Sequence, residues 1–253
     1  MGGQPPKARL RSACWRLRGE VWSDINCPWC YIGKARFEQA LAVFPHRAEV
    51  EVVHRSFELD PNAPRTARPV IPLLAAKYGM SLEQAEAAEA RIAENAHAQG
   101  LPYLDSGRDA ANSFDMHRLL HFAKEHGRQA ELLDALYRAN FAEERSAFDA
   151  QRLVELAAEA GLDSGAAAAV LADPQAYAQA VREDEATASA LGATGVPFFV
   201  LDRRLGVSDT QPAETFTRAL EQAWESRLPA PLIPVGGADA QACGPDGCEL
   251  TRR

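Results

Sequence analysis

The chain of 253 residues has no apolar run that approaches the ~18–20 residues needed by a membrane-spanning helix. It also has no excess of positive charge, because 27 Lys and Arg residues stand against 35 Asp and Glu residues, for a formal net charge of -8. The broad basic surface that nucleic-acid-binding proteins usually carry is therefore not expected. These two absences exclude a membrane and a nucleic acid from the predicted partners.

Cysteine is scarce as well, with five residues in the whole chain. This is too few for a secreted scaffold held together by disulfides. Residues 1–19 also lack the apolar core of ~7–15 residues that a secretory signal requires. We therefore expect a cytoplasmic protein, in which paired cysteines do redox chemistry or bind metal more often than they hold a fold together. Four of the five cysteines form two close pairs, Cys27 with Cys30 and Cys243 with Cys248.

Strand and helix signals alternate near the start of the chain. Residues 20–24 predict the end of a short strand, and the β-branched residues of 50–57 predict a second one. Between them lies a helical pattern in which Pro28 suits the first turn and Pro45 ends the helix. The strand–helix–strand order favours a parallel pair of strands.

The middle of the chain is dominated by Ala, Leu, Glu and Gln, which are good helix formers. It follows a proline-rich segment, residues 60–72, that we expect to be a loop. Residues 72–191 predict four to six helices, one of which starts with a capping box at Ser81. The last predicted elements are a hairpin and a helix, with strands at 196–201 and 205–208 and the helix at 212–227.

The element order predicts an α/β fold in which an all-helical domain is inserted between two halves of a strand-containing domain. The expected division has five parts: a variable N-terminal extension (1–19), the first half of the α/β domain (20–65), the inserted helical domain (66–191), the second half of the α/β domain (192–228) and a C-terminal tail (229–253).

The motif Cys27-Pro28-Trp29-Cys30 follows a strand and opens a helix, which is typical of a thioredoxin-like redox site. Unpaired N–H groups and the helix dipole favour an anion at this position, so Cys27 is the expected thiolate nucleophile. Cys30 lies one turn further on and is placed to resolve the mixed disulfide that Cys27 forms. The alternatives are a buried pair of ordinary thiols or half of a zinc site.

The sequence resembles the DsbA-like thioredoxin superfamily, and in particular its FrnE-type branch of cytosolic dithiol–disulfide isomerases. The resemblance covers about residues 20–228, and its motifs occur in the expected order. Asp209 and Thr210 depart from the pattern of the last motif. The segments that carry the resemblance are WSDINCPWCYIGK (22–34), ANSFDMHRL (111–119), TGVPFF (194–199) and SDTQP (208–212).

The resemblance implies a thioredoxin fold with a helical domain inserted after the second strand. It also implies that Pro197 is a cis-proline lying against Cys27 and Cys30, whereas the local sequence alone favours an ordinary trans proline at the start of a strand. In such proteins the backbone before the cis-proline pairs with an extended substrate peptide. Val196 takes that role here, so the expected substrate-binding residues are Val196, Pro197 and Trp29.

The same branch includes hydroxychromene-carboxylate isomerases and kappa-class glutathione transferases, in which a Ser stands where Cys27 is. The presence of both cysteines here argues for dithiol exchange. A glutathione-dependent isomerase of a small molecule is kept as the alternative function, and a zinc-binding redox switch or chaperone as a third.

The second pair, Cys243 and Cys248, encloses the turn-forming residues Gly, Pro, Asp and Gly. Three interpretations remain open: a second redox pair that exchanges electrons with the first, a regulatory or protective disulfide, and a metal clip. Some FrnE-like proteins carry such a pair, which favours the first two. Cys14 has no partner nearby and is expected to be incidental.

Two histidines, His117 and His121, lie four residues apart on a predicted helix, which is a spacing that metal ligands use. No third ligand accompanies them, so a surface or core role is favoured for His121. His117 falls within the family-like motif, which suggests a position near the active-site cleft.

The predicted function is a thiol–disulfide oxidoreductase or isomerase that acts on disulfide-containing proteins or peptides. The prediction assigns it no bound cofactor and no metal, and a cellular thiol is considered as its reductant.

Overall fold

A four-stranded sheet lies at the centre of the computed structural model, which describes residues 16–104 and 107–227. The strand order is β2-β1-β5-β6. Strand β1 pairs with β2 in parallel, whereas the β1–β5 and β5–β6 pairs are antiparallel. This arrangement confirms the predicted parallel pair and hairpin. The strands are Leu17–Ser23 (β1), Val50–Ser56 (β2), Phe198–Leu201 (β5) and Leu205–Ser208 (β6).

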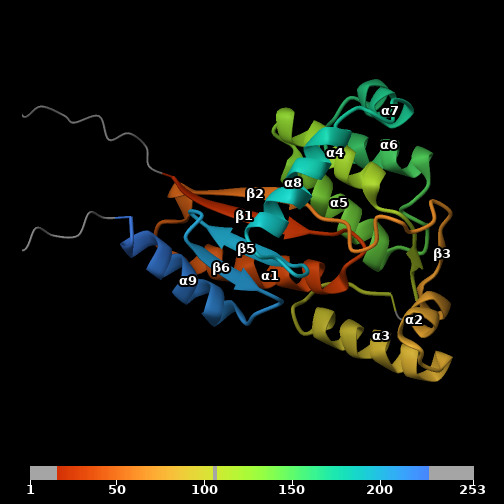
Figure 1. Cartoon of the computed structure of the whole chain (residues 1–253), viewed down its shortest axis with the longest axis horizontal. Helices are drawn as coiled ribbons and strands as arrows, with labels where there is room; N and C mark the ends of the chain where they lie inside the picture. The colour runs from red at the N-terminus through yellow and green to blue at the C-terminus, as the bar shows by residue number, and fades with distance from the viewer. Residues whose placement is uncertain (1–15, 105–106, 228–253) are drawn as a thin grey trace, which may run out of the picture.

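Helices cover both faces of the sheet (Figure 1). Helices Pro28–Val43 (α1) and Ala213–Glu225 (α9) share one core with β1, β5 and β6, and helix Ala178–Ala190 (α8) packs on the other face. Side chains alternate along a strand, so Val21 and Phe199 face α1 and α9, whereas Trp22 and Phe198 face α8. In the register of β1 with β5, Val21 pairs with Phe199 and Trp22 pairs with Phe198. Both faces of the sheet are therefore apolar at this point.

The remaining helices form the helical segment between β2 and β5, as the fold prediction requires. In Figure 1, α4–α7 lie together at one end of the molecule and α2 and α3 lie below them. A two-stranded sheet of Arg68–Pro69 (β3) and Asp109–Ala110 (β4) links the α2 region to the start of α4. The helices are Val70–Tyr78 (α2), Leu82–His97 (α3), Phe114–Glu125 (α4), Gln129–Ala142 (α5), Ala150–Glu159 (α6) and Ser164–Ala172 (α7), and a 3-10 turn spans Arg47–Glu49.

Two details of the helical segment differ from the sequence prediction. The described chain has seven helices from Val70 to Ala190, α2 to α8, where four to six were predicted. The breaks at 143–149 and 173–177 contain no glycine to mark them in the sequence. The predicted loop at 60–72 ends earlier than expected, since α2 begins at Val70. Pro72 fits there because the first turn of a helix has no acceptor for its N–H groups. The predicted capping box of Ser81 and Gln84 is confirmed at the start of α3.

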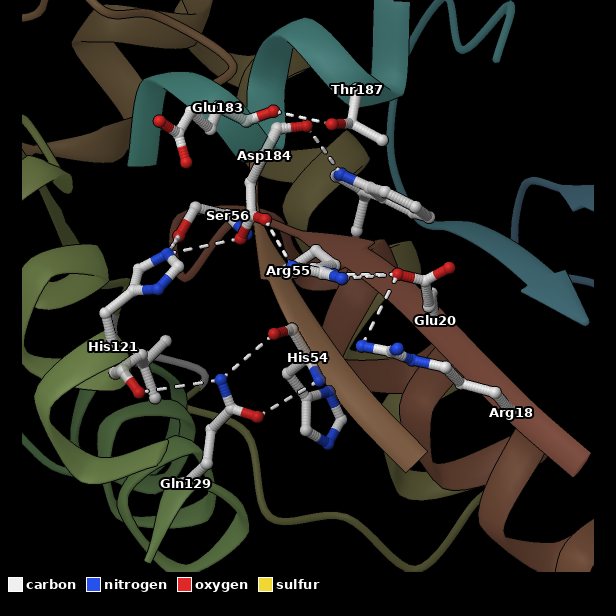
Figure 2. A network of polar contacts seen from close by, with 12 residues as sticks. Arg18, Glu20, His54, Arg55, Ser56, His121, Gln129, Glu183, Asp184 and Thr187 are labelled. Carbon is white, nitrogen blue, oxygen red and sulfur yellow. Dashed lines mark hydrogen bonds and ion pairs between the residues drawn. The ribbon is translucent and has the colours of Figure 1, made fainter. Parts of the chain in front are cut away.

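A buried polar network links α8 and α4 to β2, the strand at the edge of the sheet (Figure 2). Arg55 on β2 lies between two carboxylates, 2.5 Å from Oε1 of Glu20 and 2.8 Å from Oδ1 of Asp184. The second oxygen of Asp184 accepts the Ser56 N–H at 2.9 Å and lies 3.2 Å from Nε2 of His121. His121 is buried, so of the surface or core role expected for it the structure shows the core one. None of the helices in the described part of the chain is both long and apolar enough to cross a membrane.

Candidate active site

The Cys27–Cys30 pair lies at the junction between the end of β1 and the start of α1. Cys27 is the N-cap of α1 and Pro28 is its first residue, as predicted. The Cys30 N–H donates to the Cys27 carbonyl at 3.0 Å, which places the second cysteine one helical turn inward. Both residues are free thiols, and they expose 4% and 1% of their surface. Both cysteines are therefore buried.

The two thiols differ in their surroundings. Burial raises the pKa of the Cys30 thiol well above its usual range, and the neighbouring Cys27 adds to this effect. Cys30 is thus held as a neutral thiol. Cys27, by contrast, lines a cavity of about 550 Å³ that Cys30 does not reach. A molecule in this cavity meets Cys27 first.

The loop before β5 lies against the cysteine pair. The Val196–Pro197 peptide bond is cis, as the resemblance implies, and the Cys27 Sγ lies 3.7 Å from the Val196 carbonyl oxygen. A further link comes from Thr210, whose hydroxyl donates to the Trp29 carbonyl at 2.8 Å. The structure therefore brings together the five residues of the first predicted site: Cys27, Trp29, Cys30, Val196 and Pro197.

Gly33 sets the distance between α1 and this loop. A Cβ atom on Gly33 would lie 3.0 Å from Cγ of Pro197, tighter than nearly all real contacts. We expect Gly33→Ala to lower the free energy of unfolding by about 1 kcal/mol, because overpacking costs about 1–3 kcal/mol and exceeds the helix-propensity gain of about 1 kcal/mol. Disulfide exchange should slow as well, since Pro197 moves away from Cys27. Chemical denaturation and an exchange assay measure the two effects.

Gly195 offers the matched control, because its added Cβ would meet no atom within 4 Å. The Gly195→Ala variant should keep the stability of the wild-type protein. Equal stability of the two alanine variants would contradict a role for Gly33 in this contact.

The mouth of the cavity is apolar at its surface. Trp29 exposes 40% of its surface, and Leu59 and Tyr78 expose 44% and 62%. All three line the same cavity as Cys27, together with apolar side chains of α2 and α3. Exposed large apolar side chains gathered in one place mark a surface that binds another molecule.

Sequence reasoning missed one residue of the site, Asp24. Its Oδ1 accepts the Asn26 N–H at 3.1 Å and its Oδ2 accepts the Leu59 N–H at 2.7 Å. Burial opposes its charged form, but His117 and these two N–H groups outweigh burial and hold the pKa of Asp24 below its usual range. The only signal in the sequence was its place three residues before Cys27. The predicted position of His117 near the cleft is confirmed, since its Nε2 lies 3.6 Å from Oδ1 of Asp24.

No group of three or more His, Cys, Asp or Glu side chains is arranged to hold a metal ion within residues 16–104 and 107–227. His117 and His121 face different carboxylates and do not share a ligand position. Cys14 and the second pair, Cys243 and Cys248, lie outside the described residues. The three interpretations of that pair therefore stay predictions.

A parallel strand–helix–strand unit, an antiparallel hairpin and a Cys-x-x-Cys pair facing a cis-proline together define a thioredoxin-like redox protein. Residues 20–221 match the family described as the DSBA-like thioredoxin domain, and the chain belongs to this family. It is thus a redox enzyme of the DsbA-like oxidoreductase family.

The chain is also similar to individual proteins. The chain is similar to a probable DsbA oxidoreductase of Streptomyces coelicolor, with 61% sequence identity and a TM-score of 0.82 over 94% of this chain and 100% of that one. It is 30% identical over 145 residues to the uncharacterised protein YwbO of Bacillus subtilis, a match that spans 57% of this chain and 66%, just under two thirds, of the relative. The cytosolic disulfide reductase DsbM of Pseudomonas aeruginosa shares the fold, with 23% identity and a TM-score of 0.58 over 84% of this chain and all of that one.

Proposed function

We propose that the protein catalyses thiol–disulfide exchange on disulfide-containing proteins or peptides. One observation carries this proposal: a free Cys27 caps the N-terminus of α1, lies against the Val196 carbonyl and lines a cavity, while its partner Cys30 is buried and does not line it. Cys27 attacks the substrate disulfide and forms a mixed disulfide. Cys30 then attacks Cys27 and releases the substrate as a thiol.

The surroundings of Cys27 favour a peptide substrate. The Val196 backbone next to Pro197 offers an edge to which an extended peptide adds as a further strand. The exposed apolar side chains of Trp29, Leu59 and Tyr78 suit the apolar residues that a misfolded or misoxidised chain exposes. A small hydrophilic disulfide would leave these apolar side chains unused.

Several finer assignments belong to the same proposal. We assign the chain to the FrnE-type branch and to the cytoplasm, and a cellular thiol serves as its reductant. Cys243 and Cys248 exchange electrons with the first pair. These assignments are supported by the sequence motifs described above and by the scarcity of cysteine in the chain.

Reduction of insulin and reactivation of a scrambled disulfide protein test the proposed function. The wild-type protein should accelerate both reactions when a thiol reductant is supplied. If neither reaction is accelerated, while the protein with glutathione isomerises a chromene carboxylate, the alternative function holds instead. Stoichiometric zinc in the reduced protein, released on oxidation, would support a metal switch.

Filling the cavity tests its role in substrate binding. Ala88 on α3 lines the cavity, so we expect Ala88→Trp to raise the KM for a peptide disulfide by about tenfold, a loss of roughly 1.4 kcal/mol of binding. The neighbouring Ala87 is exposed and does not line the cavity, which makes Ala87→Trp the matched control. Steady-state kinetics with both variants give the comparison. An unchanged KM in the Ala88 variant would remove the cavity from the binding site.

A further inference from the structure

The wall of the cavity beside Cys27 contains a buried ion pair. Glu89 on α3 and Arg108, which immediately precedes β4, both line this cavity. Arg108 Nε lies 2.9 Å from Oε1 of Glu89, and the two side chains expose only 5% and 6% of their surface. The pair therefore belongs to the buried part of the cavity, whereas Trp29 and Tyr78 form its exposed mouth.

This ion pair lacks some of its hydrogen bonds. Oε2 of Glu89 and Nη1 of Arg108 are both buried, and neither has a hydrogen-bond partner among the described residues. Buried polar atoms without a partner are costly and call for an explanation. Arg108 also borders a smaller cavity of about 190 Å³, but Glu89 lines only the cavity that contains Cys27. The free acceptor on Glu89 therefore points to a ligand in the larger cavity that donates a hydrogen bond.

The other oxygen of Glu89 shows which kind of group suits this pair. The Tyr103 hydroxyl donates to Oε1 of Glu89 at 2.6 Å. The same hydroxyl accepts from Nε of Arg108 at 3.3 Å. One phenol thus serves as a donor to the carboxylate and as an acceptor for the guanidinium. A second hydroxyl in the cavity would satisfy Oε2 of Glu89 as a donor and would also be able to accept from Nη1 of Arg108.

The charges of the pair disfavour a charged ligand group. Glu89 and Arg108 neutralise each other, so neither is left to balance a further buried charge. A substrate lysine or arginine would be repelled by Arg108, and a substrate carboxylate by Glu89. Each would also lose its hydration without gaining a free counter-charge. The ligand group is therefore uncharged, as a phenol is at neutral pH because its pKa is about 10.

The remaining wall of the cavity suits an aromatic ring. Leu73 and Leu74 on α2 and Ile92 on α3 line it, and its volume of about 550 Å³ admits a large side chain. A tyrosine combines a large apolar ring with a hydroxyl that needs a partner when it is buried. A serine or threonine would leave the apolar wall uncovered, and a glutamine stem would cover less of it than a ring.

We propose that this cavity is a specificity subsite for a tyrosine side chain of the substrate, an inference that rests on the proposed exchange reaction with peptides. The ring packs against the apolar side chains of α2 and α3, and its hydroxyl donates to Oε2 of Glu89. Cys27 lines the same cavity, so the tyrosine lies near the substrate cysteine that Cys27 attacks. The protein then prefers disulfides that have a tyrosine close by, whereas an apolar surface alone would accept phenylalanine equally well.

A series of synthetic peptides tests the subsite on the wild-type protein. Each peptide has a single cysteine joined through a disulfide to thionitrobenzoate, which is coloured when it is released. The tested residue occupies, in turn, each of the two positions before and after this cysteine. Tyrosine is compared with phenylalanine, 4-methoxyphenylalanine, glutamine, glutamate and lysine. Single-turnover kinetics with the reduced protein in excess give the half-saturating concentration and the limiting rate.

We expect the tyrosine peptide to react about tenfold faster than the phenylalanine peptide at one of these positions, which corresponds to roughly 1.4 kcal/mol. The difference should lie in the half-saturating concentration and not in the limiting rate, because the hydroxyl contributes to binding. The 4-methoxyphenylalanine peptide should be no better than the phenylalanine peptide, since its oxygen cannot donate to Glu89. The glutamine, glutamate and lysine peptides should all react more slowly than the tyrosine peptide.

A variant with an apolar cluster shows whether the ion pair is responsible. Glu89→Leu, Tyr103→Phe and Arg108→Met are made together, because replacing a whole buried ion pair by apolar residues is often neutral for stability. The preference for tyrosine over phenylalanine should disappear in this triple variant. Glu86 and Arg91 are exposed residues of α3 that do not line the cavity, so Glu86→Leu with Arg91→Met is the matched control and should keep the preference. Thermal unfolding shows whether both variants are folded.

Equal reactivity of the tyrosine and phenylalanine peptides at all four positions would overturn the inference. This comparison uses the wild-type protein and so decides the matter even if the triple variant does not fold. A preference for glutamate or lysine would overturn it as well, as would a tyrosine preference that survives in the triple variant or is lost equally in the control. If the wild-type protein reacts with none of the peptides, the proposed function fails and the inference fails with it.

Discussion

Replacing Cys27 by Ser should lower the rate of disulfide exchange by about 10³-fold or more, because the hydroxyl cannot replace the thiolate as a nucleophile. Cys27 is the cysteine that lines the cavity and faces the Val196 carbonyl, so no second thiol of the pair can meet the substrate in its place. Insulin reduction with the variant and the wild-type protein provides the measurement.

The Cys30→Ser variant is the control for this experiment. It keeps the attacking thiol and loses the resolving one, so it should form a mixed disulfide and then stop. Replacing both Cys243 and Cys248 by Ser separates the tail pair from the first pair. Exchange that persists in Cys27→Ser but disappears in the tail variant would show that the tail pair is the working nucleophile.

Replacing Asp184 by Ala should lower the free energy of unfolding by about 3 kcal/mol, the lower end of the cost of breaking a buried ion pair, because Arg55 keeps Glu20 as its second partner. The carboxylate contacts Arg55, His121 and the Ser56 N–H, and all three lose this contact in the variant. The exposed neighbour Glu183 offers a matched control, and Glu183→Ala should stay within about 0.5 kcal/mol of the wild-type protein. Urea unfolding at neutral pH measures both variants.

The same network makes the stability dependent on pH. Burial opposes the charged form of Asp184, but hydrogen bonds from His121 and Ser56 and the charge of Arg55 outweigh it and lower its pKa. The pKa of Glu20 is lowered in the same way by Arg55 and Arg203 despite burial. A lowered pKa in the folded state stabilises the fold above the unfolded-state value of about 4, and this contribution is lost as the pH falls through the folded-state pKa. The Asp184→Ala variant should therefore lose less stability on acidification than the wild-type protein.

Local sequence patterns predict many of the helices and strands, because interactions between residues close in sequence determine where these elements begin and end. The strand that ends near Asp24, the helix that opens at Pro28 and the capping box at Ser81 each depend on residues close in sequence. The predicted count of four to six helices was too low because the breaks at 143–149, between α5 and α6, and at 173–177, between α7 and α8, contain no glycine that marks them.

The site was predictable only where its residues share a motif. The spacing of Cys27 and Cys30 predicts the redox pair. The role of Pro197 was predicted from the resemblance to a family. The pairing of Asp24 with His117 depends on how α4 packs against the end of β1, across more than ninety positions of the sequence. Nothing in the pattern around either residue specifies that packing, so the contact emerges only from the folded chain.

The central claim is that Cys27 attacks the substrate and Cys30 resolves it. The most direct test incubates the Cys30→Ser variant with an oxidised peptide and maps the resulting adduct by mass spectrometry. The proposed mechanism predicts one peptide bound through a disulfide to Cys27, released on addition of a thiol. An adduct on Cys243 or Cys248 with Cys27 left free, or no adduct at all, would contradict it.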